Sequence, residues 1–256
     1  MSTTVDTRFL LDSKSLDLNS SSQQSLEFLS NIRILDNPKD NETWIKHHKG
    51  NLYCISDDLI QRIAKVSPQK FTAQVADFND NLSYKMQEQP GLEHLGIPSN
   101  LIGDVVGSNQ FLLSFLSTDE TIPQPAHVDY SWDNLEKYGD DLDIGFFPLT
   151  KDGMFLQVWS RDDDRNKIIK GELVYVPYGR LLILTSNTIH GGGFRTTRNL
   201  GKHGNLRAHL YIARNGTSLS ITQTNKYTEP GNKRYELSER YVDCSHMKEI
   251  VDFLFV

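Results

Sequence analysis

From residue 109 onward the chain is a series of short apolar segments separated by Gly, Pro, Asp and Asn. Segments of this length are typical of β-strands, and the residues between them favour turns. Strands do not alternate with helical patterns here, which argues against a parallel α/β sheet. The pattern predicts an all-β sandwich or barrel, with strands at 110–117, 143–148, 154–160, 172–176, 180–185, 188–192 and 206–213.

The flanking regions follow a different pattern. Residues 1–108 are expected to form a mostly helical support, with helices at 25–35, 57–66 and 71–85, and with residues 44–55 as an early strand or a turn-rich segment. Ser56 is a plausible N-cap for the second helix. A C-terminal extension, 214–256, ends in an amphipathic helix at 245–254. We therefore expect a single domain, 1–256, around a β core at 109–213.

Composition excludes several classes of protein. The net charge of −6 does not favour a nucleic acid as partner. Two distant cysteines, Cys54 and Cys244, give neither a disulfide framework nor a thiolate metal site. Neither a signal peptide nor an 18-residue apolar run is visible, so no membrane association is expected. A cytoplasmic location is the expectation, with a nuclear one left open.

A first candidate for chemistry is the pair His127 and Asp129. In an extended segment, residues i and i+2 point to the same face, so one small ion can contact both side chains. A His-x-Asp pair also occurs by chance in many chains. On its own it is weak evidence for a metal site.

A second histidine, His190, follows a pair of predicted strands and precedes Gly191, Gly192 and Gly193. Three glycines leave room for another group to approach closely. The alternative is a core or turn histidine whose glycines serve the bend. With His127 and Asp129 it completes two histidines and one carboxylate, the facial arrangement that non-haem Fe(II) favours and that leaves coordination positions open.

Arg207 is the third element. Residues 206–213 alternate, and Arg207, His209 and Tyr211 share the face opposite to the aliphatic residues. A buried guanidinium is costly unless it is paired, and it suits bidentate binding of a carboxylate. The alternative is an arginine that is satisfied by a distant acidic residue or exposed to solvent.

His127-x-Asp129, then His190, then Arg207 resemble, in order and spacing, the Fe(II)- and 2-oxoglutarate-dependent dioxygenase superfamily. The segments 155–159 and 188–192 are similar to those of the phytanoyl-hydroxylase-like branch. The resemblance covers residues 109–213. It implies a double-stranded β-helix (jelly roll) in which His127, Asp129 and His190 hold Fe(II) and Arg207 binds the distal carboxylate of 2-oxoglutarate. It also implies O₂ as cosubstrate and ascorbate as a stimulant.

The sequence departs from the family at one position. Some branches place a serine two residues after the arginine, and here that residue is His209. Further cosubstrate contacts are then expected from Gln157, Tyr175 or Thr185. Because Asp129 is a carboxylate and not the small residue of related halogenases, the resemblance implies hydroxylation, or demethylation through it, with formation of succinate and CO₂.

The substrate is the least constrained part. Residues 130–143 are polar, acidic and aromatic, and they form either a solvated connection or a lid in which Tyr130 and Trp132 offer stacking surfaces. A small molecule or a peptide is the expected substrate, and the sequence does not indicate an oligomeric state.

Three rival functions stay open. One is a cupin-like metal protein that does not use 2-oxoglutarate, for which Arg207 would have no purpose. Another is a catalytically inactive binding module, for which the complete set of four residues would have no purpose. A nucleic-acid demethylase is the third, and the acidic balance of the chain disfavours it.

Overall fold

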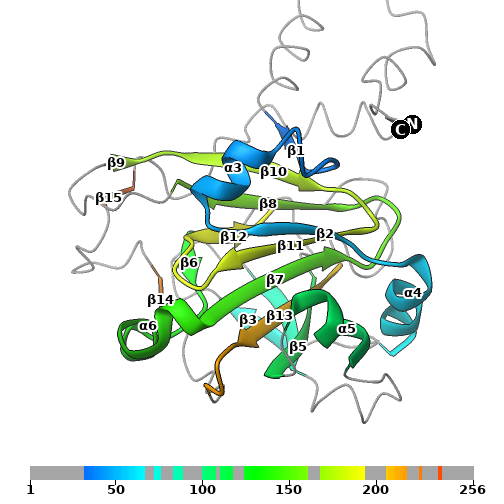
Figure 1. Cartoon of the computed structure of the whole chain (residues 1–256). Helices are drawn as coiled ribbons and strands as arrows, with labels where there is room; N and C mark the ends of the chain where they lie inside the picture. Colours follow the sequence, from blue (N-terminus) through cyan, green and yellow to red (C-terminus); the bar gives the residue numbers. More distant parts are fainter. Residues whose placement is uncertain are drawn as a thin grey trace, which may run out of the picture.

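Two facing β-sheets dominate the molecule (Figure 1). The computed structural model describes residues 32–66, 72–75, 83–88, 100–107, 110–117, 124–160, 168–193, 206–217, 225–226 and 236–237. The six-stranded sheet has the order β1 (Arg33–Ile34), β10 (Gly171–Val176), β8 (Met154–Trp159), β12 (His190–Gly192), β6 (His127–Val128) and β14 (Asn225–Lys226). The seven-stranded sheet has the order β2 (Asn51–Cys54), β11 (Arg180–Thr185), β7 (Leu142–Pro148), β13 (Arg207–Ala213), β5 (Gln110–Ser117), β4 (Ser83–Glu88) and β3 (Thr72–Val75).

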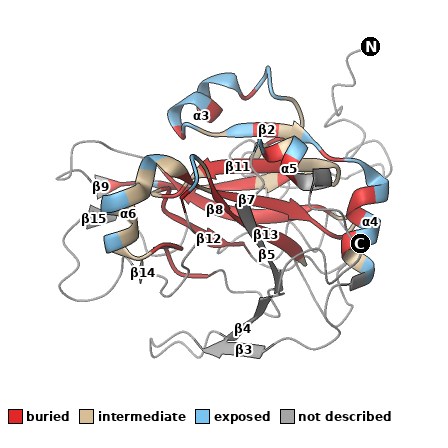
Figure 2. Ribbon diagram, turned by 60° about the horizontal axis from the view of Figure 1, so that its bottom comes forward, coloured by how far each residue is buried: buried red, intermediate tan, exposed pale blue. Residues whose placement is uncertain are grey.

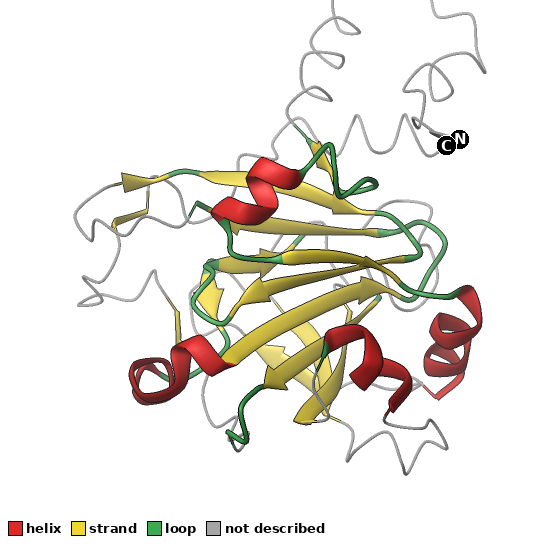
Figure 3. Cartoon of the chain, viewed as in Figure 1, coloured by secondary structure: helices red, strands yellow, loops and turns green. Residues whose placement is uncertain are grey.

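The helices and the remaining strands are peripheral (Figure 3). The helices are α3 (Glu42–His47), α4 (Asp57–Val66), α5 (Asn100–Val106) and α6 (Trp132–Tyr138), which a 3₁₀ turn (Gly139–Asp141) follows. A small parallel pair joins β9 (Ile168–Ile169) to β15 (Glu236–Leu237). None of the described helices is long and apolar enough to cross a membrane.

The connectivity is that of a jelly roll. Between β5 and β13 the chain passes from one sheet to the other at β6, β7, β8, β11, β12 and β13, while β8 and β10 are antiparallel neighbours within the six-stranded sheet. The four central strands of each sheet are β11-β7-β13-β5 and β10-β8-β12-β6, and the neighbours within each set are antiparallel. This arrangement is the double-stranded β-helix that we predicted.

Alternation along β13 determines which side chains face the interior. Leu210 and Ile212 pack in a cluster with Ile60 and Ile63 of α4, which covers the outer face of the seven-stranded sheet. Tyr211 packs in a second cluster between the sheets, with side chains of β7, β8, β10 and β11. Strands β6, β7, β8, β10, β11, β12 and β13 are largely buried, and the described helices keep exposed residues (Figure 2). Arg207 and His209 therefore point into the barrel with Tyr211.

Most of the predicted elements are present. The strands at 110–117 and 180–185 match β5 and β11, and the other predicted strands differ from the observed ones by at most two residues at either end. The predicted helix at 57–66 is α4. Ser56 Oγ accepts a hydrogen bond from the backbone N–H of Leu59 at 3.3 Å, as an N-cap side chain does.

Two local predictions were wrong. The expected helix at 71–85 is replaced by β3 and β4, which pair with each other and extend the sheet beyond β5. Strand pairing at a sheet edge here overrides the helix-like spacing of apolar residues. The expected connection at 130–143 is largely α6 and its 3₁₀ turn, with Ser131 as N-cap.

The N-terminal region is also less helical than predicted. Its described part contributes β1 and β2 to the two sheets, in addition to α3, α4 and α5. Residues 44–55 form most of α3 and then β2. The expected helix at 25–35 lies mostly outside the described residues, and its described end contains β1. The expected helix at 245–254 lies wholly outside them.

Candidate metal centre

His127, Asp129 and His190 meet in the interior of the barrel. Each offers a ligand atom within 4.8 Å of the ligand atoms of the other two. β6 and β12 are antiparallel neighbours in which His127 lies opposite His190, so the two rings are adjacent, with centroids 4.6 Å apart. His127 Nε2 is 3.6 Å from Asp129 Oδ1, and His190 Nε2 is 3.1 Å from Oδ2. All three residues are buried.

The outer nitrogen of each histidine is held by the backbone. His127 Nδ1 lies 2.8 Å from the carbonyl oxygen of Pro125, and His190 Nδ1 lies 3.1 Å from that of Thr188. Since a carbonyl oxygen only accepts hydrogen bonds, Nδ1 must carry the proton in both rings. When such a ring is neutral, its Nε2 lone pair is directed at the carboxylate. Metal-bound histidines are commonly oriented in this way.

The electrostatics of the cluster require a cation. Burial lowers the pKa of His127 to about 4, so this ring is neutral at pH 7. Burial alone would raise the pKa of Asp129, but the neighbouring His190 and His209 hold it well below its usual range. A buried carboxylate that faces imidazole lone pairs needs a proton or a metal ion between them. Two nitrogens and one oxygen suit a divalent transition metal.

Arg207 lies in the same interior and is 1% exposed. Its Nη2 donates to Gln124 Oε1 at 3.1 Å. Burial lowers the pKa of Arg207 to about 10 while the charge of Asp129 opposes the shift, so the guanidinium remains a cation at neutral pH. A buried guanidinium beside a neutral amide is suited to a bidentate carboxylate ligand.

Gln124, which no motif in the sequence indicated, lies just before β6 and forms hydrogen bonds with both β12 and Arg207. Its Oε1 also accepts from the backbone N–H of Gly192 at 2.7 Å, and its carbonyl oxygen accepts from Gln157 Nε2 at 2.7 Å. In the sequence it is a glutamine between two prolines, three residues before His127. Only its place in the fold distinguishes it from a turn residue.

The glycines after His190 are explained by the chain itself and not by a ligand. A Cβ on Gly192 would lie 2.2 Å from Arg207 Nη2 and 2.5 Å from Gln124 Oε1. A Cβ on Gly193 would lie 2.5 Å from the Cβ of Phe155. The room that we expected next to His190 is therefore filled by protein atoms. Glycine is needed at 192 so that Arg207 can pass close to β12.

His209 is a second residue whose contact with the metal centre was not predicted. Its Nε2 lies 3.2 Å from Asp129 Oδ2. The ring stacks on Phe146, its partner on the neighbouring strand, with centroids 4.6 Å apart and planes at 14°. Burial lowers the pKa of His209. The sequence placed this residue on the same strand face as Arg207 and noted its departure from the family pattern, but it did not indicate the contact with Asp129.

The other predicted cosubstrate contacts have structural partners elsewhere. Gln157 is fully buried and is bonded to the backbone of Gln124. The hydroxyl of Tyr175 donates to the carbonyl of Asp152 at 2.9 Å, and burial raises its pKa to about 12. Thr185 Oγ1 donates to Asn187 Oδ1 at 3.0 Å. Gln157 therefore shares Gln124 as a partner with Arg207, whereas Tyr175 and Thr185 bond to other residues.

The two predicted stacking residues differ in exposure. Tyr130 is 1% exposed, and its hydroxyl donates to the carbonyl of Asp143 at 2.9 Å. Trp132 is partly buried at the start of α6 and packs against the cluster that contains Ala126 and Val128. Tyr130 is therefore a core residue, and only Trp132 keeps an accessible surface near the metal centre.

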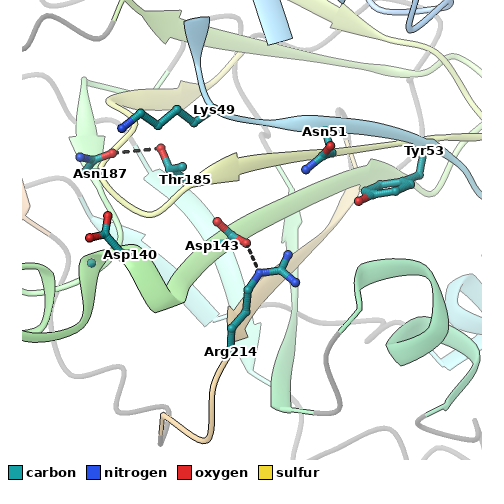
Figure 4. A pocket seen from close by; sticks show the side chains of 9 residues that line it. Lys49, Asn51, Tyr53, Asp140, Asp143, Thr185, Asn187 and Arg214 are labelled. Carbon is teal, nitrogen blue, oxygen red and sulfur yellow. Dashed lines mark hydrogen bonds and ion pairs between the residues drawn. The ribbon is translucent and has the colours of Figure 1, made fainter. Parts of the chain in front are cut away.

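A separate pocket of about 380 Å³ opens at the ends of β7, β11 and β13 (Figure 4). Polar side chains line it, including Lys49, Thr185 and Asn187, and its floor holds an ion pair between Arg214 Nε and Asp143 Oδ2 at 2.7 Å. Thr185 points into this pocket, which shares no residue with the metal centre.

Comparisons with known proteins identify similar solved structures. Neither a family model nor a curated protein matches the chain. An oxidoreductase of the 2OG-Fe(II) oxygenase family from Burkholderia pseudomallei matches at 12% identity and a TM-score of 0.42, covering 72% of this chain and 94% of that one. HygX from Streptomyces hygroscopicus, with nickel and 2-oxoglutarate bound, matches at 11% and 0.44, covering 81% and 98%. The epimerase SnoN from nogalamycin biosynthesis matches at 10% and 0.43, covering 80% and 100%.

Proposed function

We propose that the protein is an Fe(II)- and 2-oxoglutarate-dependent oxygenase. It would hydroxylate a small molecule or a peptide, or demethylate it through hydroxylation, while 2-oxoglutarate is converted to succinate and CO₂. The observation that carries the proposal is one buried interior that contains a two-histidine, one-carboxylate cluster and a buried arginine. The first suits the metal, and the second suits a carboxylate cosubstrate.

His127, Asp129 and His190 would hold the metal. The carbonyls of Pro125 and Thr188 keep the Nε2 lone pairs directed inward, so little reorganisation is needed on binding. Three protein ligands leave positions for a bidentate cosubstrate and for O₂. Iron in such a site supplies O₂ activation with electrons from 2-oxoglutarate, and ascorbate maintains its reduced state.

Arg207 would bind the distal carboxylate of 2-oxoglutarate. The guanidinium is charged and buried, so its interaction with a carboxylate is weakened little by solvent. Gln124 orients it from the side of β12. Burial of the whole set also limits the access of water to the reacting centre.

The substrate would approach along α6. This helix begins three residues after Asp129, and Trp132 at its start offers an aromatic surface. Its exposed residues include the acidic Asp133 and Glu136, which favour a neutral or cationic substrate over a polyanion such as a nucleic acid.

A metal enzyme of the same barrel that does not use 2-oxoglutarate is the second candidate. The observation that favours it is the hydrogen bond from Arg207 to Gln124, since the amide oxygen occupies a donor of the guanidinium. The two candidates differ in whether 2-oxoglutarate is consumed.

The test is succinate formation by the purified protein. With Fe(II), ascorbate and O₂ we expect slow conversion of 2-oxoglutarate to succinate even without substrate, and none with His127→Ala. Metal binding without succinate formation would support the second candidate. Equal turnover in wild type and His127→Ala would refute the assignment of the metal centre. A mass-spectrometric screen for the gain of one oxygen atom would then identify the substrate.

A further inference from the structure

His209 of β13 is a buried histidine beside Asp129. It is 1% exposed, and neither of its ring nitrogens has a hydrogen-bond partner among the described residues. Asp129 Oδ2, 3.2 Å from His209 Nε2, is buried and likewise without a hydrogen bond. Two adjacent buried polar groups without hydrogen bonds are costly, so we expect them to form a hydrogen bond with each other when the site is filled.

His209 differs from His127 and His190 because no backbone carbonyl of the described residues fixes a proton on its Nδ1, so its proton is free to face the carboxylate from Nε2. A neutral ring with its proton on Nδ1 would direct the Nε2 lone pair at a carboxylate oxygen, which is repulsive. With its proton on Nε2, the same ring becomes a donor to Oδ2. His209 thus differs from His127 and His190 in its tautomer. The latter two carry a proton on Nδ1, which leaves the Nε2 lone pair available for a metal.

The position of His209 also separates it from the metal ligands. Only His127, Asp129 and His190 are close enough together to share one ion among the described residues. The rings of His209 and His190 are 6.5 Å apart, compared with 4.6 Å for His127 and His190. Stacking on Phe146 and contact with Tyr211, at 4.3 Å between centroids, hold the ring against Asp129 Oδ2, the oxygen that His190 Nε2 also approaches, at 3.1 Å.

We propose that His209 is a positioning residue that donates from Nε2 to Asp129 Oδ2 and so leaves Oδ1 to bind the metal beside His127. The proposal rests on the proposed metal centre and extends it by one residue. A carboxylate with one oxygen held by a hydrogen bond is restrained from rotating away from the ion, and partners of this kind raise metal affinity.

The test compares side chains that keep or remove the donor. His209→Gln places an amide N–H close to the position of Nε2, while His209→Phe keeps the stacking on Phe146 and removes the donor. His209→Asn, whose amide is shorter, is a second loss variant if the Phe variant does not fold. Affinity for Co(II) is measured by titration without O₂, together with the Co(II) absorption spectrum and the melting temperature of the metal-free protein.

We expect His209→Phe and His209→Asn to weaken Co(II) binding roughly 10- to 100-fold. His209→Gln should stay within about threefold of wild type, as one restored hydrogen bond allows. Wild-type Co(II) affinity in His209→Phe would overturn the proposal. It would also be overturned if His209→Gln lost Co(II) binding as completely as His127→Ala and had a changed absorption spectrum, because His209 would then be a metal ligand. Neither result depends on succinate formation by the wild type. The role of His209 and the proposed function can therefore be refuted independently of each other.

Discussion

The two sheets of the barrel contribute to the same interior in different ways. The six-stranded sheet supplies His127 and His190 from β6 and β12, and Asp129 directly follows β6. Each of its histidines is oriented by a carbonyl two residues earlier in its own chain segment. The seven-stranded sheet supplies Arg207 and His209 from β13, and both contact groups of the opposite sheet or of the segments next to it.

The comparison predicts that the two histidines of the proposed metal centre and the proposed cosubstrate residue Arg207 have separate structural supports. The two histidine ligands are oriented by backbone carbonyls of their own segments, whereas Asp129 is the ligand that His209 of β13 contacts. Arg207 depends on Gln124 and on the absence of a side chain at Gly192, and so on contacts between the sheets. Variants on β6 and β12 should therefore change metal affinity, and Arg207 variants should change the requirement for 2-oxoglutarate.

The largest effect is expected from Asp129→Ala. Loss of the only carboxylate among the three groups removes the charge that compensates a divalent ion, so Co(II) affinity should fall by about 1000-fold or more, beyond the 10- to 100-fold typical of indirect partners. Binding is followed by the rise in melting temperature that Co(II) causes in the wild type. Arg207→Ala is the control and should keep that rise. Equal losses in the two variants would contradict the separation between the sheets.

Acid should destabilise the metal-free protein through the six-stranded sheet. The pKa of His127 is about 4 in the folded protein and 6.5 in its ordinary state, so between these values the unfolded chain binds a proton that the folded chain does not. The free energy of unfolding therefore has its full value, as far as His127 is concerned, above pH 6.5. It falls as the pH is lowered from 6.5 to about 4, because the neutral buried ring resists protonation. The decrease amounts to about 3 kcal/mol.

Urea unfolding with a chelator present, repeated between pH 7 and pH 4.5, measures this effect. His127→Gln keeps a polar side chain that does not titrate, so its free energy of unfolding should fall less over the same range. Arg207, whose pKa is lowered only to about 10, adds nothing in this window. Identical pH slopes in wild type and His127→Gln would show that the ring is not buried in its neutral form.

Much of the fold could be predicted because its signals are local. Strand alternation around Arg207 identified the inward face of β13, and turn residues marked the ends of β5 and β11. The hairpin of β3 and β4 could not be predicted, because pairing with β5 decides its structure and the spacing of its apolar residues does not. Tyr130 likewise belongs to the core through its bond to Asp143, a contact that residue type does not reveal.

The site divides in the same way. His127, Asp129 and His190 were predictable because a metal demands particular residue types at restricted spacings. Gln124 and His209 were not, since each acts through another side chain and has no motif of its own. A residue that supports a functional group across two sheets leaves no periodic signal in the sequence.

Arg207→Ala should produce the next largest effect, on the cosubstrate. Without the buried guanidinium, 2-oxoglutarate loses its charge-assisted hydrogen bonds, so the concentration needed for half-maximal succinate formation should rise about 50-fold. Co(II) affinity should stay within about threefold of wild type. Arg207→Lys keeps the charge without the bidentate geometry, so its 2-oxoglutarate requirement should lie between those of the wild type and Arg207→Ala. An unchanged requirement would move the carboxylate site away from β13.

The smallest effect is expected from Gln124→Glu, which tests whether contacts between the sheets limit cosubstrate binding. The new carboxylate would pair with Arg207 at the position where Gln124 Oε1 now accepts a hydrogen bond, and it would compete with the distal carboxylate of 2-oxoglutarate. We expect roughly a tenfold higher requirement for 2-oxoglutarate. Gln124→Ala removes the same contact without adding a charge and is the matched control. If the glutamate and alanine variants raise the 2-oxoglutarate requirement equally, Gln124 acts by orienting Arg207. In that case the Arg207 Nη2 donor that Gln124 occupies is not the one that binds the cosubstrate.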